Sequence, residues 1–205
     1  MNTQEALEAH MRRVILQEFV SLDGLAAGPH ESVDFIPAST QGDQTFGREQ
    51  LELMDTVDTL LLGRVTYGMF AGFWPKVTEG PEKEFADKFN GVPKVVFSKT
   101  IDRAPWGEWK EGRIARGSAE DEVTKLRQQS GKNMLLSGSI SVAQALMAKG
   151  LIDEYRLVLC PIVLGSGHPL FHDGAAGSTP MKLRSAKRLD RGAVSLIYDP
   201  LEVRA

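Results

Sequence analysis

The chain has 205 residues, of which 42% are hydrophobic and 25% are charged, and its formal net charge is -3. This composition is typical of one globular domain with a substantial core. It has no basic run interleaved with aromatic residues, which excludes the pattern of a nucleic-acid-binding surface. Its single cysteine, Cys160, excludes an internal disulfide and a cysteine-cluster metal site.

The first ten residues contain acidic side chains and no apolar core, so they lack the pattern of a signal peptide. No stretch approaches the roughly eighteen consecutive apolar residues that a membrane span needs. We therefore expect a cytoplasmic protein with no membrane contact. Residues 1–11 are expected to form a polar extension, and residues 12–205 a single domain.

The spacing of apolar residues predicts helices and strands along the first half of the chain. In order these are a strand at 13–20, a turn at 21–24, a long loop at 26–44, a helix at 45–56, a strand that ends at Gly63, a helix that starts at Arg64 and ends near Pro75, a helix at 81–90 and a strand at 94–98. Proline disfavours helical geometry in the residue before it, which explains the helix end near Pro75.

The second half continues the alternation and then changes to strands alone. Its predicted elements are a loop at 106–112, a strand at 113–116, a helix from Ser118, a strand at 133–136, a turn at 137–139, a helix over 142–147, a strand at 155–164, a turn at 165–167, and a hairpin of 182–189 with 193–198. Pro161 indicates that the strand at 155–164 is an edge strand or contains a bulge. This order predicts a three-layer α/β fold: a central mixed, mostly parallel sheet with helices on both faces and a C-terminal antiparallel hairpin.

Two turns combine a strand end, a glycine and a helix start. They are Gly63-Arg64-Val65-Thr66 and Ser137-Gly138-Ser139-Ile140. The free N–H groups of a helix N-terminus suit a phosphate group, and Arg64 would add a forked cation. Neither turn has the G-x-G-x-x-G pattern of a standard dinucleotide site. The alternatives are an ordinary strand-to-helix joint with a surface arginine, and a glycine at 138 that close packing requires.

Three further residues and the histidines are candidates for chemistry. Ser98 and Lys99 leave a strand where they could bind an anion, and Asp23 follows the first strand beside the long loop. A turn aspartate that bonds to its own backbone is an equally good interpretation of Asp23. The histidines lack ligand spacing, so we expect no metal site; they are His10, His30, His168 and His172.

Several separated segments, in this order, resemble the dihydrofolate reductase fold. More closely, they resemble the reductase domain at the C-terminus of the bifunctional riboflavin-biosynthesis deaminase-reductase and its stand-alone relatives. The segments are 21–24, 61–67, 95–98, 136–139, 150–156 and 161–167. Together they lie within residues 12 to about 198, nearly the whole chain.

The resemblance implies an NADPH site across the sheet. It implies that the cofactor contacts Gly63, Arg64, Val65 and Thr66 at one turn, Ser98 and Lys99 near the 2′-phosphate, and Ser137, Gly138, Ser139, Ile140 and Ser141 at the other turn. It places Val20 and Asp23 beside the nicotinamide, with Asp23 as the candidate catalytic residue. Phe46, Trp74 and the 26–44 loop would wall the substrate pocket. Relatives with the C-terminal hairpin are often dimers, so a homodimer is also expected.

Departures from the family pattern bear on the substrate. Riboflavin-pathway reductases usually have an acid where this chain has Leu136, and an Asp-Asp-Pro segment with an arginine where residues 67–75 are aromatic and uncharged. Dihydrofolate reductases place an acid on the first helix, for which Asp43 and Glu49 are the nearest candidates. We therefore expect an NADPH-dependent reductase of a small aromatic or heterocyclic substrate. The alternatives are 5-amino-6-(5-phosphoribosylamino)uracil reductase and a non-catalytic nucleotide- or ligand-binding protein on the same fold.

Overall fold

The structure is a computed structural model that describes residues 11–171 and 179–201. Its main feature is a nine-stranded sheet with the order β10-β11-β8-β1-β7-β3-β4-β6-β5. The strands are β1 (Val14–Val20), β3 (Val57–Gly63), β4 (Lys94–Phe97), β5 (Ala104–Trp106), β6 (Trp109–Ala115), β7 (Asn133–Ser137), β8 (Glu154–Leu159), β10 (Met181–Arg188) and β11 (Val194–Pro200). The six strands from β8 to β6 are mutually parallel, whereas β5, β10 and β11 pair antiparallel. The predicted mixed, mostly parallel sheet with its C-terminal hairpin is confirmed.

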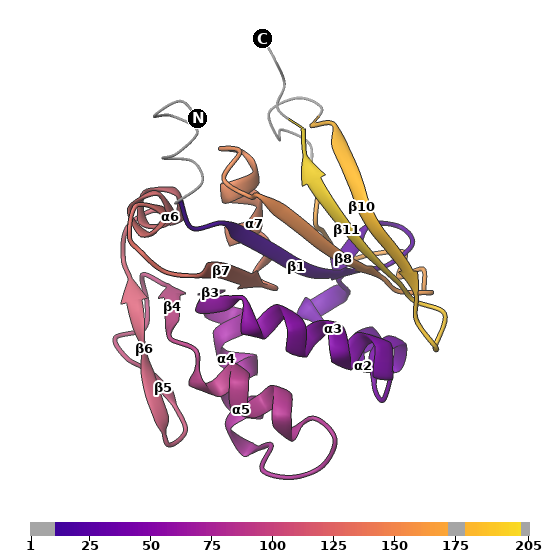
Figure 1. Cartoon of the computed structure of the whole chain (residues 1–205), viewed down its shortest axis with the longest axis horizontal. Helices are drawn as coiled ribbons and strands as arrows, with labels where there is room; N and C mark the ends of the chain where they lie inside the picture. The colour runs from indigo at the N-terminus through magenta and orange to yellow at the C-terminus, as the bar shows by residue number, and fades with distance from the viewer. Residues whose placement is uncertain (1–10, 172–178, 202–205) are drawn as a thin grey trace.

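Helices cover both faces of this sheet and make three layers (Figure 1). One face carries α3 (Gln44–Asp55), α4 (Arg64–Phe73) and α5 (Lys83–Gly91), and the other carries α6 (Ala119–Arg127) and α7 (Ile140–Met147). Successive side chains of a strand point to opposite faces, so Leu60 and Leu62 pack on the α3 face and Leu61 on the α7 face. Both faces are buried, which explains the continuous apolar run in β3.

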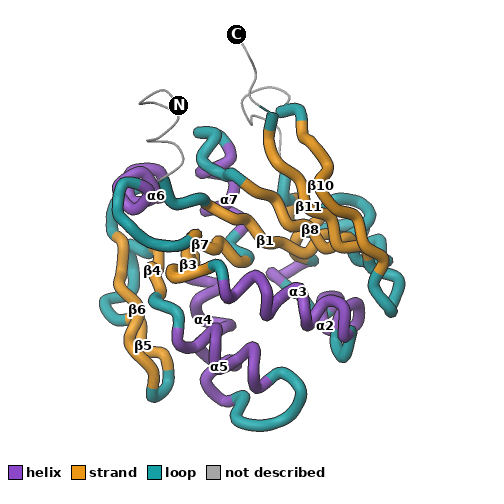
Figure 2. Tube along the Cα trace, in the orientation of Figure 1, coloured by secondary structure: helices purple, strands orange, loops and turns teal. Residues whose placement is uncertain are grey.

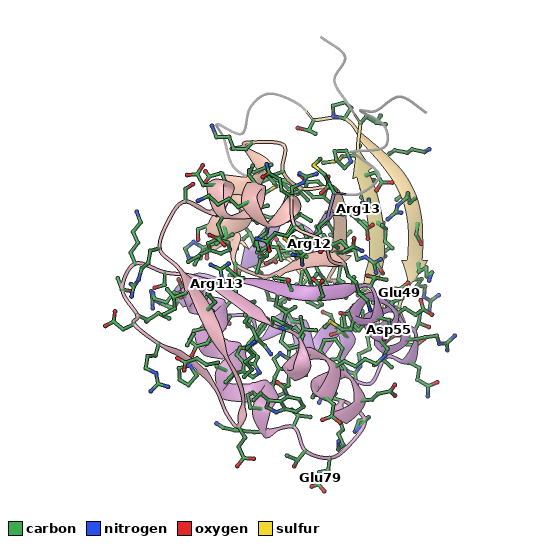
Figure 3. The ribbon with its side chains drawn as sticks, turned by 60° about the vertical axis from the view of Figure 1, so that its left-hand side comes forward. Arg12, Arg13, Glu49, Asp55, Glu79 and Arg113 are labelled. Carbon is green, nitrogen blue, oxygen red and sulfur yellow. The ribbon has the colours of Figure 1, made fainter. Side chains whose placement is uncertain are left out.

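The first helix of the α3 face is anchored to the C-terminal hairpin by two acids. Asp43 caps α3 by accepting a hydrogen bond from the Phe46 N–H (2.8 Å), and its other oxygen accepts one from the Asp190 N–H. Glu49 pairs with the Lys187 amine (2.7 Å) and accepts a hydrogen bond from Ser195 (2.8 Å). Figure 3 shows Glu49 beside the hairpin strands. Both candidate acids of the first helix are therefore already occupied in holding α3 to the sheet.

Three predicted segments differ from the structure. The 26–44 loop contains strand β2 (Leu25–Ala27), which pairs with β9 (His168–Pro169), the short helix η1 (Pro29–Glu31) and α2 (Phe35–Thr40). The predicted 106–112 loop is instead a hairpin of β5 and β6, which is clear at the lower left of Figure 2. Strand β8 ends at Leu159, so Pro161 lies beyond it, and β8 is an interior strand between β1 and β11. Strand β2 depends on a distant pairing partner, which local composition does not report, whereas β5 and β6 form a hairpin between neighbouring segments.

Among the described residues, no helix is long and apolar enough to cross a membrane. The prediction for residues 1–11 lies almost wholly outside the described residues.

A buried polar network connects α5 to the edge of the sheet. Asn90 accepts a hydrogen bond from the Trp106 indole N–H (2.7 Å) and donates one to the Trp74 carbonyl (3.0 Å). The Lys94 amine donates to the Asn90 carbonyl and lies 4.5 Å from the centre of the Trp106 ring. Lys94 is only 3% exposed, and burial lowers its pKa to about 7. This lysine is therefore largely uncharged above neutral pH.

Replacing Lys94 with methionine is expected to change how stability depends on pH. The pKa of Lys94 is lower in the folded chain than in the unfolded chain, so the unfolded chain binds more protons between pH 8 and pH 10. Stability conferred through Lys94 should rise with pH over that window, by at most about 1.4 kcal/mol per pH unit. Thermal unfolding at both pH values checks this, with Lys110→Met as a control at an exposed lysine. If the stability of wild type and of Lys94→Met changed equally between pH 8 and pH 10, this prediction would be wrong.

Candidate cofactor and active site

The two glycine turns lie side by side at the carboxyl edge of the sheet. Strands β3 and β7 are parallel neighbours, with Leu61 opposite Leu136, so their carboxyl ends meet at one edge. Strand β4 joins them there, with Phe97 opposite Gly63. Ligands of open α/β sheets bind at this edge, where helix N-termini point outward. The sheet therefore brings the segments after β3, β4 and β7 together, as predicted.

A direct contact joins the two turns. The Gly63 N–H donates a hydrogen bond to the Ser139 hydroxyl oxygen (2.7 Å). A Cβ at Gly63 would lie 3.3 Å from the Cβ of Ser139, and a Cβ at Gly138 would lie 3.1 Å from the Thr66 methyl carbon. A Cβ at either position would be in tight contact with the opposite turn, so glycine favours this close approach. The packing interpretation of Gly138 is correct, and this packing brings the two turns together.

Ser139 adopts a backbone conformation that costs energy. Its φ of 67° and ψ of 58° are left-handed, which costs a non-glycine residue on the order of 1–3 kcal/mol. Its hydroxyl oxygen accepts from Gly63, so it does not cap α7, and α4 has no side-chain cap either. Both helices therefore present uncapped first-turn N–H groups, which are suited to anion binding.

Two cations border these helix N-termini. Arg64 is the first residue of α4 and is exposed, and Lys99 is exposed just after β4. Within residues 11–171 and 179–201, neither forms an ion pair within 4.0 Å. Five other arginines do form ion pairs, namely Arg12, Arg103, Arg113, Arg116 and Arg127. The Ser98 hydroxyl oxygen accepts from the N–H groups of Thr100 (3.2 Å) and Ile101 (3.3 Å) and so shapes the turn that carries Lys99. Both cations are available to an anion.

Asp23 fastens two loops together. Its carboxylate accepts hydrogen bonds from the N–H groups of Leu164 (3.1 Å) and Gly165 (2.8 Å), in the loop after β8. A hydrogen bond from Ser21, followed by these two, lowers the pKa of Asp23 to about 2. The carboxylate is ionised at neutral pH, so it cannot donate a proton there. The geometry fits a structural role, because Asp23 bonds both within its own turn and to a distant loop.

Val20 ends β1 close to this loop. Its side chain is 6% exposed and packs with Ala26 and Leu170, and its carbonyl accepts a hydrogen bond from the Cys160 N–H (2.8 Å). Only its backbone is therefore placed to border a ligand at the carboxyl edge.

The two predicted pocket-wall aromatics lie in different clusters. Phe46 packs edge-to-face on Phe19, near the carboxyl end of β1, with 5.8 Å between ring centres. Trp74 follows α4, packs on Phe85 and Phe89, and bonds through its carbonyl to Asn90, just before β4 begins. Because α4 runs from the carboxyl edge of the sheet back towards the amino edge, it carries Trp74 away from the glycine turns. The structure does not bring Phe46 and Trp74 together into one wall.

Two polar side chains of β1 are buried at this edge, and the sequence interpretation missed both. The side-chain amide of Gln17, which is 6% exposed, donates to Gln50 of α3 (2.8 Å), but its side-chain oxygen Oε1 has no partner among the described residues. Glu18 is 5% exposed, and one of its oxygens, Oε2, likewise has none. Burial raises the pKa of Glu18 to about 8, and the Gly138 N–H opposes this shift. The sequence does contain a signal for Glu18, because a glutamate that shares one face of a buried strand with Leu16 and Val20 is expected to be buried.

The histidines and two cavities lie apart from the glycine turns. His30 is exposed in η1 and His168 is exposed in β9, whereas His10 and His172 are outside the described residues. No group of three metal-binding side chains occurs in the described part of the chain. A cavity of about 250 Å³ borders Arg12 and Arg113, which Figure 3 labels, and one of about 560 Å³ borders Arg13. Both lie near the amino ends of the parallel strands.

Comparison with known proteins places these features in a family. Residues 12–195 match the family model described as the RibD C-terminal domain. The uncharacterized protein YyaP of Bacillus subtilis (strain 168) is 31% identical over 189 residues, which is 91% of this chain and 94% of YyaP. A second uncharacterized protein of that strain, YwjB, is 28% identical over 91% of this chain and 97% of its own length.

Solved structures show the same fold. A putative riboflavin biosynthesis protein from Shewanella sp. PV-4 superimposes with a TM-score of 0.72 at 24% identity, covering 93% of this chain and 99% of that one. Dihydrofolate reductase from Enterococcus faecalis, complexed with NADP(H), gives 0.60 at 10% identity, covering 93% and 97%. The fold is therefore dihydrofolate reductase-like, and the chain belongs to the RibD C-terminal domain family.

Proposed function

We propose that this protein is an NADPH-dependent reductase of a small aromatic or heterocyclic substrate. The observation that carries the proposal is the contact between Gly63 and Ser139, which holds two uncapped helix N-termini together at the carboxyl edge of the sheet. Membership of a reductase family and the likeness to a reductase solved with NADP(H) support the same conclusion.

The residues at this edge fit a dinucleotide phosphate. The first-turn N–H groups of α4 and α7, from Val65 to Thr66 and from Ile140 to Ser141, would hold the pyrophosphate. Arg64 and Lys99 would bind the remaining phosphate charge. When bound, the cofactor supplies the hydride, whereas the protein orients the reactants and excludes water.

The charges around the site favour an uncharged substrate. Asp43 and Glu49 are engaged by the C-terminal hairpin, so α3 offers neither to a cationic ring. Leu136 is fully buried where riboflavin-pathway reductases usually have an acid. A site without charged partners cannot select a substrate that requires them. The riboflavin-pathway activity remains the second candidate, because the family and the Shewanella protein's name favour it.

Thermal unfolding with NADPH, NADH, FMN and no ligand tests the cofactor. A ligand that binds only the folded chain stabilises it by about 2.7 kcal/mol at a hundred times its Kd. NADPH is expected to raise the unfolding temperature more than NADH, because Arg64 and Lys99 can bind the additional 2′-phosphate. An unfolding temperature that saturating NADPH leaves unchanged would refute the proposed function. Turnover with candidate heterocycles then separates an enzyme from a non-catalytic binding protein.

Substituting alanine for Arg64 should weaken NADPH binding without destabilising the fold. A hydrogen bond to a charged group contributes about 1.5–3 kcal/mol, which corresponds to roughly a ten- to hundredfold increase in Kd. The free energy of unfolding should change by less than about 0.5 kcal/mol, because Arg64 is exposed. The matched control is Arg48→Ala, at an exposed arginine of α3. If both variants bind NADPH as wild type does, Arg64 is only a surface residue.

A further inference from the structure

Glu18 lies in an apolar environment where a carboxyl group is costly. Its side chain shares the α7 face of β1 with Leu16 and Val20, and Leu157 is its neighbour in β8. Tyr155 on β8 and Tyr198 on β11 belong to the same cluster, and burial raises the pKa of Tyr155 to about 12. No charged group contributes to the pKa shift of Glu18, which comes from burial and the Gly138 backbone. The helices α6 and α7 and the strands β2 and β7 contribute apolar side chains to it. Glu18 therefore has no cationic partner on this face, in the part of the chain that the structure describes.

The position of Glu18 connects it to the second glycine turn. Gln17 is opposite Ser137 in the sheet, and the Gly138 N–H donates a hydrogen bond to the Gln17 carbonyl (3.1 Å). The carboxyl of the next residue, Glu18, lies against the same Gly138 amide. Its Oε2 is buried with no hydrogen-bond partner among the described residues. The buried carboxylates Glu49 and Glu154, in contrast, both form ion pairs. A buried carboxyl without a cationic partner in the described part of the chain thus lies behind a turn of the proposed cofactor site.

We propose that Glu18 is a positioning residue of the cofactor site, whose uncharged carboxyl supports the turn at Gly138 and Ser139 and whose ionisation expels the cofactor. This proposal rests on the proposed NADPH site, because it concerns a phosphate held by that turn. The uncharged carboxyl leaves the dipole of α7 unopposed for a phosphate. An ionised Glu18 would bring a negative charge behind the same turn, where the low dielectric hardly screens its repulsion of the phosphate.

Linkage gives the coupling a measurable sign. Burial raises the pKa of Glu18 to about 8, so the group loses its proton within an accessible pH range. If the ionised form weakens cofactor binding, then bound cofactor must raise the pKa of Glu18 further, because the coupling is reciprocal. Binding near pH 8 should therefore take up protons from the solvent.

The experiment measures the Kd of NADPH at pH 7 and pH 9.5 for wild type, Glu18→Gln and Glu49→Gln. Glutamine keeps the shape of Glu18 but cannot ionise. We expect the Kd of wild type to rise about tenfold between the two pH values, within the usual range of such couplings. Glu18→Gln should keep the pH 7 affinity at both values. Glu49→Gln, a buried carboxylate on the opposite face of the sheet, should behave as wild type.

A second measurement needs no variant. Carbon-13 NMR of glutamate-labelled wild type follows the Glu18 carboxyl through its titration, with and without NADPH. An upward shift of its pKa on binding supports the proposal, and an unchanged pKa overturns it. Equal pH dependence of Kd in wild type and Glu18→Gln also overturns it while leaving the proposed cofactor intact. Absence of NADPH binding by wild type at pH 7 instead overturns the proposed function, and this inference with it.

Discussion

The hydrogen bond from the Gly63 N–H to the Ser139 hydroxyl is the contact on which the site depends. It requires the parallel register of β3 and β7, which brings the two turns to one edge. It is favoured by glycine at 63 and at 138, because a Cβ at either would be in tight contact with the opposite turn. It also diverts the Ser139 hydroxyl from capping α7. The result is a pair of helix N-termini whose N–H groups remain available for an anion.

The buried polar groups on the α3 face of the sheet stabilise packing. On the α3 face, Asp43 and Glu49 fasten the helix to the C-terminal hairpin, and Asn90 satisfies Trp106 and Trp74. These groups stabilise packing because each has a partner, and a buried polar group without one would cost about 1–3 kcal/mol. Acids that anchor α3 are not available to a substrate, so the same contacts that hold the helix also leave its ligand side without a free carboxylate from Asp43 or Glu49.

Much of the fold follows from local sequence, and the exceptions are short strands and the direction of one helix. The β3–α4 and β7–α7 units were predictable because an apolar run, a glycine and a helical stripe are adjacent in the chain. Strand β2 becomes a strand only through its pairing with the distant β9, which its own sequence does not reveal. The β5–β6 hairpin pairs neighbouring segments, but its short strands lack a clear alternation of apolar residues. Pro161 suggested an edge strand, whereas β8 simply ends before it. For the site, the turns were found from their glycines, but the location of Trp74 depends on the direction of α4, which composition does not reveal.

Several unfavourable local features lie at the carboxyl edge of the sheet, although His30 and Glu31 also have a left-handed φ and Arg127 Nε also lacks a partner in the described part of the chain. Ser139 has a left-handed backbone, and Gln17 and Glu18 each bury an oxygen that has no partner among the described residues. Elsewhere the buried acids Glu49 and Glu154 are paired, and the Lys94 amine donates to a carbonyl. Natural sequences are locally consistent except where function requires a departure, so strain and unpaired groups indicate a site independently of any motif. The strained Ser139 and the two unpartnered oxygens beside the glycine turns are therefore a second physical argument that this edge binds a ligand.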